Sequence, residues 1–482
     1  MLAQRLRPFG WEESGASVAG LTLDQFRFTL SMFASIVVCY GFRHLKGSLA
    51  RNLYSVVTGF ALLAYPFGVE CFQLLVPSIV TYLAMMFSPK HCAKIAWVFN
   101  FSILIYMHVA QASGLSWNEG KMDITGGLMI LVLKLNALAT ARQDSTRKVE
   151  HLNPYQQSHV VRNQPNLLEF LSYTVSMGSL LSGPFFEFSE FQQFINEQGI
   201  WSPKAALGLP SFFRSMTRAF LLLLESVVYF AVFVRWGHWN GAVMLTPWYH
   251  GLPLLHKYSV MFFTGAMFQF KYYAAWKLAE AGYVLAGFDF LGWEGKEETK
   301  KEEEKGKKPS TALWGRCKNA SFFGVWTADS ARSVPQNWNI CTGKWLRRYV
   351  YERITPRQRK PGFQHLLCTQ FVCAIWHGLF PGYQLFFFGT VIWIYMSQVL
   401  FRAETHVDPK WIRFLPYRVL KIVWTNVVLN YLASSFQLLL WKESIDSYLE
   451  VYMIPHVILI GFCLCGAFVK PKRLTAAGKV GA

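Results

Sequence analysis

The feature that most constrains this chain is a series of long apolar stretches that recur along its whole length. Hydrophobic residues make up 53% of the 482 residues and aromatic residues 17%, including 18 Trp and 41 Phe. Soluble globular proteins rarely combine such an apolar fraction with so many large aromatic side chains. Repeated stretches near the length that spans a bilayer as a helix therefore predict an all-α polytopic integral membrane protein.

These stretches predict where the chain crosses the membrane. Pro66-Phe67-Gly68 separates a closely spaced pair, and Gly183-Pro184 ends a short stretch that we expect to be re-entrant or interfacial, because proline stops helices. Residues 254–285 exceed one crossing and carry charges, so we expect them to tilt, bend or face a polar interior. The apolar segments are 25–42, 53–65, 71–87, 93–112, 124–141, 167–181, 212–234, 254–285, 366–376, 385–401, 411–440 and 452–469.

The basic residues indicate orientation in the membrane and not nucleic-acid binding. The chain has 47 Lys and Arg against 28 Asp and Glu, a formal net charge of +19. They cluster at the ends of apolar stretches, as the positive-inside rule describes, and no basic–aromatic array lies outside the spans. If these ends are cytosolic, the N-terminus lies on the far side and about eleven crossings follow. A contribution to binding anionic headgroups or a phosphorylated cosubstrate stays open.

We expect one membrane domain over residues 1–482, because the chain shows no repeat and no soluble domain of substantial size. Residues 1–22 form an N-terminal segment, the Lys- and Glu-rich residues 294–310 a flexible cytosolic loop, and residues 470–482 a basic cytosolic tail. The nine cysteines include no CxxC pair, so we expect neither a disulfide framework nor a metal site. The acceptor pattern at Asn319 follows the cytosolic loop, and we do not expect it to be glycosylated.

Three ionisable side chains inside apolar stretches are candidates for function: His108, Lys134 and His377. Such a group is costly at membrane depth and is by default a functional hypothesis. A structural hydrogen bond to a neighbouring helix explains a lone His or Lys about equally well. His377 has the more suggestive neighbours, since Gly378 leaves room for close approach and Pro381-Gly382 is expected to end the helix soon afterwards.

A second polar group lies upstream of this histidine. Asn337 and Asn339 flank Trp338 just before a basic amphipathic segment, residues 344–353. Asparagine can hold a carbonyl oxygen without the cost of burying a full charge. A histidine base with an asparagine donor, and no Ser or Cys nucleophile nearby, suggests direct transfer to an alcohol. The spacing between Asn339 and His377 corresponds to no fixed helical geometry, so on spacing alone this pairing stays a hypothesis.

Several motifs together resemble the membrane-bound O-acyltransferase superfamily. The pattern is similar, more narrowly, to its lysophospholipid acyltransferase branch and to the broad-specificity lysophosphatidylcholine acyltransferases of plants and fungi. At motif level the resemblance covers residues 123–383. The matching motifs are Asp123-Ile124-Thr125-Gly126-Gly127-Leu128-Met129, Gly183-Pro184-Phe185-Phe186-Glu187, Phe270-Lys271-Tyr272-Tyr273-Ala274-Ala275-Trp276, Gln336-Asn337-Trp338-Asn339-Ile340, Trp345-Leu346-Arg347-Arg348-Tyr349-Val350-Tyr351-Glu352-Arg353, Trp376-His377-Gly378 and Pro381-Gly382-Tyr383.

The resemblance implies a fold and a set of site residues. The fold would have about eleven transmembrane helices, with re-entrant or interfacial helices, around an internal chamber. His377 would be catalytic, and Asn339, not Asn337, would be its partner. The anionic head of coenzyme A would meet basic residues at the cytosolic mouth, although interfacial snorkelling explains these equally well. The expected substrate-binding residues are Trp376, Gly378, Trp338, Lys344, Arg347 and Arg348.

The resemblance also implies an activity. A fatty acyl group would pass from acyl-CoA, as cosubstrate, to the free glycerol hydroxyl of a lysophospholipid during phospholipid remodelling and synthesis. Lysophosphatidylcholine is the first expectation, followed by lysophosphatidylethanolamine or lysophosphatidylserine, and no resident cofactor is expected. The sequence ends Lys-Val-Gly-Ala without the dilysine signal of many relatives, so residence in the endoplasmic reticulum membrane rests on the resemblance. Acyl preference and oligomeric state stay open.

Rival interpretations stay open as well. Within the same superfamily the acceptor could be diacylglycerol, a sterol or a protein. From a different class, the chain could be a transporter with His108, Lys134 and His377 along its pathway, and helices broken at Gly183-Pro184 and Pro381-Gly382 fit that interpretation. The lack of an inverted repeat argues against it. A non-catalytic scaffold would not need the histidine and asparagine of the motifs.

Overall fold

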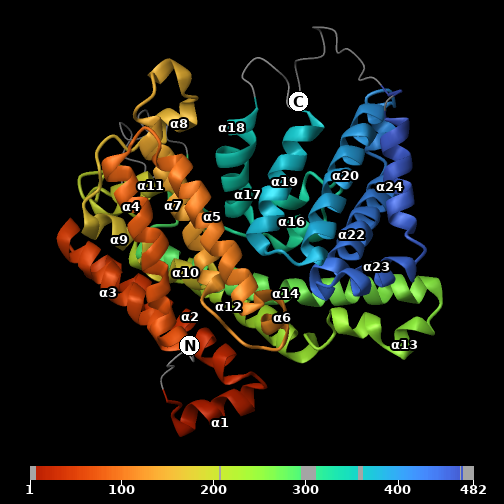
Figure 1. Ribbon diagram of the computed structural model, residues 1–482, viewed down its shortest axis with the longest axis horizontal. Helices are drawn as coiled ribbons and strands as arrows, with labels where there is room; N and C mark the ends of the chain where they lie inside the picture. Colours follow the sequence, from red (N-terminus) through yellow and green to blue (C-terminus); the bar gives the residue numbers. More distant parts are fainter. Residues whose placement is uncertain (1–6, 206–207, 295–310, 356–361, 467, 470–482) are drawn as a thin grey trace. The chain divides into compact units, whose positions relative to one another are not determined.

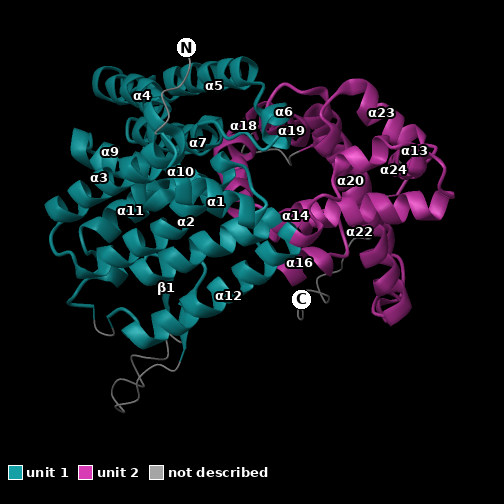
Figure 2. Ribbon diagram, turned by 90° about the horizontal axis from the view of Figure 1, so that it is seen from below, with its two compact units in different colours: residues 1–234, 271–320 teal, residues 235–270, 321–482 magenta. Residues whose placement is uncertain are grey.

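The computed structural model describes residues 7–205, 208–294, 311–355, 362–466 and 468–469. These residues are mostly helical, and their strands form a two-stranded antiparallel sheet of β1 (Phe290–Trp293) and β2 (Ala312–Trp314). The chain, drawn in Figure 1, forms two compact units, which Figure 2 shows in different colours: unit 1 holds residues 1–234 and 271–320, and unit 2 holds residues 235–270 and 321–482. The predicted loop 294–310 beyond its first residue and the tail 470–482 lie outside the described residues.

Unit 1 reproduces the predicted apolar segments of the N-terminal half as helices. The second helix begins at a capping box, where the Thr22 hydroxyl accepts the Gln25 N–H at 3.2 Å. Pro66 lies in the last turn of the third helix, and a 3₁₀ turn follows, so the predicted break is confirmed. The helices are α1 (Gly10–Ala19), α2 (Leu23–Gly41), α3 (Ser48–Phe67), α4 (Leu75–Phe87), α5 (Cys92–Gln111), α6 (Ser113–Asn118), α7 (Thr125–Asp144), α8 (Pro154–His159), α9 (Leu167–Val175), α10 (Ser179–Ser182), α11 (Phe188–Ile195) and α12 (Phe212–Trp236).

Helix α7 lies inside unit 1 and is buried along nearly its whole length. It packs against α4, α5 and α10 (Figure 1). A helix that is enclosed on all sides can carry a polar side chain if that side chain finds partners within the protein. Lys134 is such a side chain, since it is fully buried at the middle of α7.

Lys134 holds the broken segment that follows α9. Its Nζ lies within hydrogen-bonding distance of the carbonyl oxygens of Tyr173 and Thr174 and of the hydroxyls of Ser176 and Ser179. Carbonyl groups at a buried helix end have lost their helical partners and must be satisfied in another way. The predicted short stretch 167–181 consists of two short helices, α9 and α10, and Lys134 holds the segment between them; its re-entrant or interfacial position stays a prediction.

Unit 2 gathers its core around Tyr431 and Leu432 of α22, with residues from α20, α23 and α24 packed against them. Its elements follow the chain from a 3₁₀ turn to the last helix. They are η6 (Gly241–Leu245), α13 (Pro247–His250), the first half of α14 (Leu254–Ala286), α16 (Phe322–Trp326), η7 (Val334–Gln336), α17 (Ile340–Trp345), the π-helical turn η8 (Leu346–Tyr351), α18 (Glu352–Ile354), α19 (Phe363–His377), α20 (Pro381–Glu404), α21 (Pro409–Ile412), α22 (Leu415–Leu438), α23 (Trp441–Leu449) and α24 (Ile454–Cys465).

Within the described residues, six helical stretches are long and apolar enough to cross a membrane, or seven if one bent pair counts as a single span. The bent pair is α23 and α24, which meet at 82°. The chain is therefore a multi-pass membrane protein, and the count of about eleven crossings stays a prediction. The six stretches are Leu23–His44, Ser48–Phe87, Cys92–Gln111, Phe212–Leu245, Pro381–Glu404 and Leu415–Leu438.

Of three predicted boundaries, one agrees with the structure and two differ. Helix α14 matches the predicted segment 254–285 and runs without interruption, and its charged Lys277 pairs with Glu280 at 3.0 Å; that this helix tilts or faces a polar interior stays a prediction. The last apolar segment, predicted as 452–469, is a helix of only 12 residues. Pro381 does not end the helix of His377; it begins α20, because proline is well suited to the first turn of a helix.

The first testable feature is the buried carboxylate of Glu12, which ties α1 to the rest of unit 1. It accepts hydrogen bonds from the Arg27 guanidinium at 2.7 and 3.2 Å and from the Tyr65 hydroxyl. The Arg27 bonds outweigh burial, which acts in the opposite direction, and hold the pKa of Glu12 at about 2 instead of 4.5. A lowered folded-state pKa contributes stability that is present above pH 4.5 and is lost as the pH falls toward 2.

We therefore expect Glu12→Gln to lower the Tm of the detergent-purified protein near neutral pH. The difference in Tm between the two proteins should shrink as the pH falls below about 4.5. Thermal unfolding of both proteins over a pH series measures it. A difference that stays constant across the series would contradict the assigned pKa.

The second testable feature is the hydrogen-bonded ammonium of Lys134. Replacement of Lys134 by Met keeps the volume but leaves buried acceptors without a donor, at a cost of about 1–3 kcal/mol for each acceptor that stays unsatisfied. We expect a clear loss of Tm and of folded yield. Leu133→Met exchanges the neighbouring buried apolar side chain for another of similar volume and should have little effect. Equal Tm values for the two variants would refute a structural role for the ammonium.

Candidate active site

His377 is the last residue of α19, and the conformation of Gly378 explains why the helix stops there. Gly378 has φ 131° and ψ 177°, a region of backbone space that only glycine occupies readily. Its N–H closes the helix on the carbonyls of Ala374 and Ile375, both at 3.1 Å. The prediction that the histidine lies at a helix end is confirmed, and the role seen for this glycine is conformational.

Aromatic rings from three helices surround the half-buried imidazole of His377. Phe387 of α20 stacks on it, with ring centroids 5.1 Å apart and an interplanar angle of 25°. Phe436 of α22 meets it at 80° and 5.1 Å, and Trp376 at 76° and 4.7 Å. Tyr383 lies at 5.8 Å. Face and edge contacts of this kind are favoured arrangements for aromatic rings, so they fix where the imidazole lies.

The ends of α20 and α22 approach so closely that only glycine fits between them. The N–H of Gly382 donates to the carbonyl of Leu439 at 2.7 Å. A Cβ atom at Gly382 would lie 2.1 Å from the carbonyl oxygen of Ser435, which no real side chain tolerates. This contact brings the C-terminal end of α22 beside the start of α20, and with it Phe436 beside His377.

The two upstream asparagines have different surroundings. Asn337 has a structural role. Its side-chain amide donates to the backbone carbonyl of Ser333 at 3.0 Å, and its backbone carbonyl accepts the Ser321 N–H at 2.8 Å. Asn339 precedes α17 in the left-handed conformation, with φ 47°, which asparagine tolerates better than most residues. Its backbone carbonyl accepts the Gly343 N–H at 2.9 Å. The structure thus distinguishes the two residues, and the catalytic role of Asn339 stays a prediction.

The remaining predicted binding residues lie around the same helices of unit 2. Trp338 packs against the buried cluster that contains Tyr431 and Leu432 of α22. The basic residues lie on α17 and on η8, which packs against α19. Lys344 is exposed, and Arg347 is exposed and paired with Glu352 at 3.0 Å, whereas Arg348 is half-buried. A π-helical turn is rare and frequently marks a functional site.

The other two ionisable candidates lie in unit 1. His108 is buried in the last turn of α5, with its ring 6.4 Å from Trp117. The indole of Trp117 donates to Asp123 at 3.0 Å, and the same carboxylate accepts the Thr125 N–H at the start of α7. The motif beginning at Asp123 thus serves helix capping here. Lys134 is hydrogen-bonded to the broken segment after α9, and its Nζ lies 4.5 Å from the ring centroids of Tyr173 and Phe186.

Two ring neighbours of His377, Phe387 and Phe436, were not predicted from the sequence. They follow the histidine by ten and by 59 positions, and nothing in the local pattern separates them from the other phenylalanines of a chain that has 41. Only the packing of α20 and α22 against α19 identifies them.

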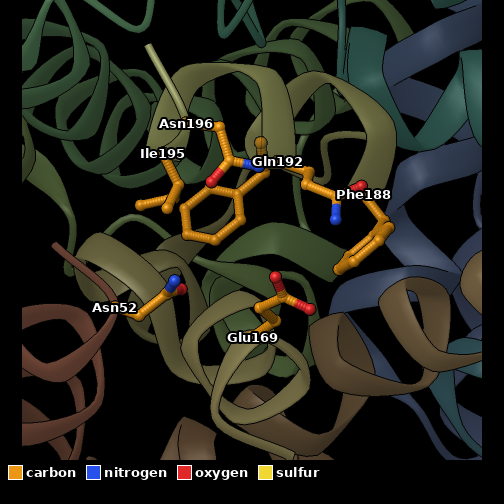
Figure 3. Close-up of a pocket in the computed structure, with 7 residues that line it drawn as sticks. Asn52, Glu169, Phe188, Gln192, Ile195 and Asn196 are labelled. Carbon is orange, nitrogen blue, oxygen red and sulfur yellow. The ribbon is translucent and has the colours of Figure 1, made fainter. Parts of the chain in front are cut away.

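A small pocket with a cavity volume of about 10 Å³ lies in unit 1, between α3, α9 and α11 (Figure 3). It is smaller than the roughly 300–1,000 Å³ typical of small-molecule sites. None of the predicted catalytic or binding residues lines it, so we assign no substrate to it. Its lining residues are Asn52, Glu169, Phe188, Phe191, Gln192, Ile195 and Asn196.

Comparison with known proteins gives a consistent result over nearly the whole chain. It is 32% identical to lysophospholipid acyltransferase 1 of Arabidopsis thaliana over 465 residues, which cover 95% of this chain and 98% of the relative. It is 29% identical to the lysophospholipid acyltransferase of Schizosaccharomyces pombe, covering 88% and 82%. It is 26% identical to membrane-bound glycerophospholipid O-acyltransferase 2 of Mus musculus, covering 95% and 87%.

A sequence model of the membrane-bound O-acyltransferase family matches residues 109–441, which is more than half of the chain. The matched region includes all of the predicted site residues. The chain therefore belongs to the membrane-bound O-acyltransferase family.

Proposed function

We propose that this protein is a lysophospholipid acyltransferase that moves a fatty acyl group from acyl-CoA to the free glycerol hydroxyl of a lysophospholipid. The observation that carries the proposal is the full-length similarity to lysophospholipid acyltransferases, within which Trp376-His377-Gly378 forms a helix end enclosed by aromatic rings. Lysophosphatidylcholine is the proposed first acceptor, with lysophosphatidylethanolamine or lysophosphatidylserine as further acceptors. The reaction serves phospholipid remodelling and synthesis.

His377 is the general base of the proposed reaction. The neutral imidazole takes the proton of the acceptor hydroxyl as the hydroxyl oxygen attacks the thioester carbonyl carbon of acyl-CoA. The carbon–sulfur bond then breaks, the sulfur leaves as the thiol of free CoA after taking up a proton, and the new ester bond completes the diacyl phospholipid. No covalent acyl-enzyme is needed, so no Ser or Cys nucleophile is needed either.

Asn339 is the proposed oxyanion donor. Its side-chain amide would hold the thioester carbonyl oxygen as negative charge develops on it, and removal of one such donor typically costs 10²–10³ in kcat. Its support is the family motif and the position of Asn339 before α17, whose continuation η8 packs against the helix of His377. The different task of Asn337, in holding the preceding loop, is consistent with the choice of Asn339.

The cellular setting is also part of the proposal. The protein would cross the endoplasmic reticulum membrane about eleven times, with the acyl chains of both substrates in apolar surroundings and their heads meeting in an internal chamber. The anionic head of CoA would approach from the cytosol. Lys344, Arg347 and Arg348 are the proposed contacts, because charge attraction favours phosphates there.

Substitution of His377 tests the catalytic proposal directly. We expect His377→Ala and Asn339→Ala each to lower kcat by about 100-fold or more, which is the range of general-base and oxyanion contributions. The assay uses microsomes at matched expression, with labelled oleoyl-CoA and lysophosphatidylcholine.

Two histidine variants serve as controls for this assay. His365→Ala removes a histidine from the first turn of the same helix, where its ring accepts the Gly362 N–H, and should retain activity. His108→Ala tests the rival histidine of unit 1. Turnover near that of the unmodified protein in the His377 variant would refute the mechanism. Loss of turnover in the His108 variant alone would identify His108 as the general base instead.

The basic residues generate a separate prediction about substrate affinity. We expect Lys344→Gln combined with Arg348→Gln to raise the KM for acyl-CoA several-fold and to leave the KM for the lysophospholipid unchanged, because only CoA carries several phosphate charges. Added salt should weaken this difference. Lys442→Gln removes a fully exposed charge that pairs with Asp446 on α23 and is the matched control. An unchanged KM for acyl-CoA in the double variant would exclude these residues as its contacts.

A further inference from the structure

We infer that Phe436 of α22 is a positioning residue that holds the imidazole of His377 in its reactive orientation. The inference rests on the proposed function, because it matters only if His377 is the base. Phe436 lies 59 positions after the histidine, outside every motif that carries the family resemblance. Its role is assigned from the geometry of the aromatic rings around His377 and Phe436 in unit 2.

The imidazole lies in a corner made by two phenylalanines. Phe387 covers one face at 5.1 Å with an interplanar angle of 25°, and Phe436 meets it edge-on at 5.1 Å and 80°. The two phenylalanine rings lie 6.3 Å apart, at 73° to each other. Stacking on Phe387 resists rotation of the imidazole about χ2, but it lets the ring slide across the face of Phe387 as χ1 changes. Phe436 stands nearly perpendicular to the imidazole and limits this sliding, because the imidazole would have to move into it.

Phe436 can restrain the histidine because its own ring is braced. Its centroid lies 4.7 Å from that of Tyr383, 5.3 Å from Phe386 and 6.0 Å from Phe268. The backbone beside it is fixed by the contact of Gly382 with Ser435 and Leu439. A phenylalanine has only two side-chain torsions, so a braced one is a stiff support at little entropic cost.

The position of His377 makes such a support necessary. It is the last residue of α19, so no side chain from a following turn of the same helix lies over the imidazole. A general base must be held within about 0.5 Å and 10–20° of its productive geometry, and a misplacement of 1 Å can cost about 100-fold in rate. A hydrocarbon ring fixes the imidazole without competing for its nitrogens, whereas a polar neighbour would take up the N–H or the lone pair that proton transfer requires.

The test separates positioning from simple packing. Phe436→Leu removes the flat ring, and we expect kcat to fall about tenfold or more while the KM values for acyl-CoA and lysophosphatidylcholine stay within about twofold. Phe436→Met supplies an adaptable side chain of similar size in case the leucine variant folds poorly, and it should lose kcat in the same way. Phe436→Tyr restores a ring at the same place and should recover most of the rate.

Phe386→Leu is the matched control, since it makes the same change in the same cluster and leaves Phe436 braced by Tyr383 and Phe268. It should change Tm about as much as Phe436→Leu and lower kcat much less. Two results would overturn the inference about Phe436 and leave the proposed function standing. One is an equal loss of kcat in the two leucine variants, and the other is an unchanged kcat in the folded Phe436 variants while His377→Ala is inactive. An active His377→Ala would instead overturn the proposed function on which the inference rests.

Discussion

The backbone of Gly378 is the constraint on which the arrangement around His377 depends. Its φ of 131° and ψ of 177° stop α19 directly after the histidine and turn the chain toward Pro381, where α20 begins. α20 then carries Tyr383 and Phe387 to the imidazole. Its first turn accepts the end of α22 against Gly382, and α22 supplies Phe436. The glycines of the Trp376-His377-Gly378 and Pro381-Gly382-Tyr383 motifs are thus explained by backbone geometry, and they place the aromatic side chains around the histidine.

Buried backbone N–H and C=O groups that leave a regular helix need hydrogen-bond partners. In unit 1 a side chain supplies them. There the break after α9 exposes carbonyl groups inside the protein, and the ammonium of Lys134 satisfies them. Lys134 and His377 are both ionisable groups within apolar helices, yet their surroundings differ. Oxygen acceptors of the broken segment hold the lysine, which also lies over the rings of Tyr173 and Phe186, whereas aromatic rings from three helices restrain the half-buried histidine. This difference supports a structural role for the first and a chemical role for the second.

Much of the fold follows from the sequence because apolar length and helix-breaking residues act locally. The segments 25–42, 93–112, 212–234 and 385–401 coincide with helices, and Pro66 marks a break where one was expected. The prediction that Pro381 ends a helix is wrong, since Pro381 begins α20. Proline disrupts the interior of a helix but suits its first turn, and the sequence pattern alone does not show which position it occupies.

The candidate site was only partly predictable. His377 and its position at a helix end could be predicted, since a histidine in an apolar run followed by glycine is visible in the sequence. The contacts of Phe387 and Phe436 with the histidine could not be predicted, because they arise from the packing of three helices. Nothing in the sequence distinguishes these two phenylalanines from the others. The roles of Asn339 and of the basic residues on α17 and η8 depend on the family motif, and they stay proposals until the variants are measured.

The central claim is that this protein transfers an acyl group from acyl-CoA to a lysophospholipid. The most direct measurement supplies oleoyl-CoA and lysophosphatidylcholine to the purified protein in nanodiscs and follows free thiol and diacyl product together. We predict one free thiol for each phosphatidylcholine formed, with no thiol released when the lysophospholipid is left out. Thiol release without lipid product, or movement of lysophospholipid across the membrane with no thiol released at all, would contradict the claim.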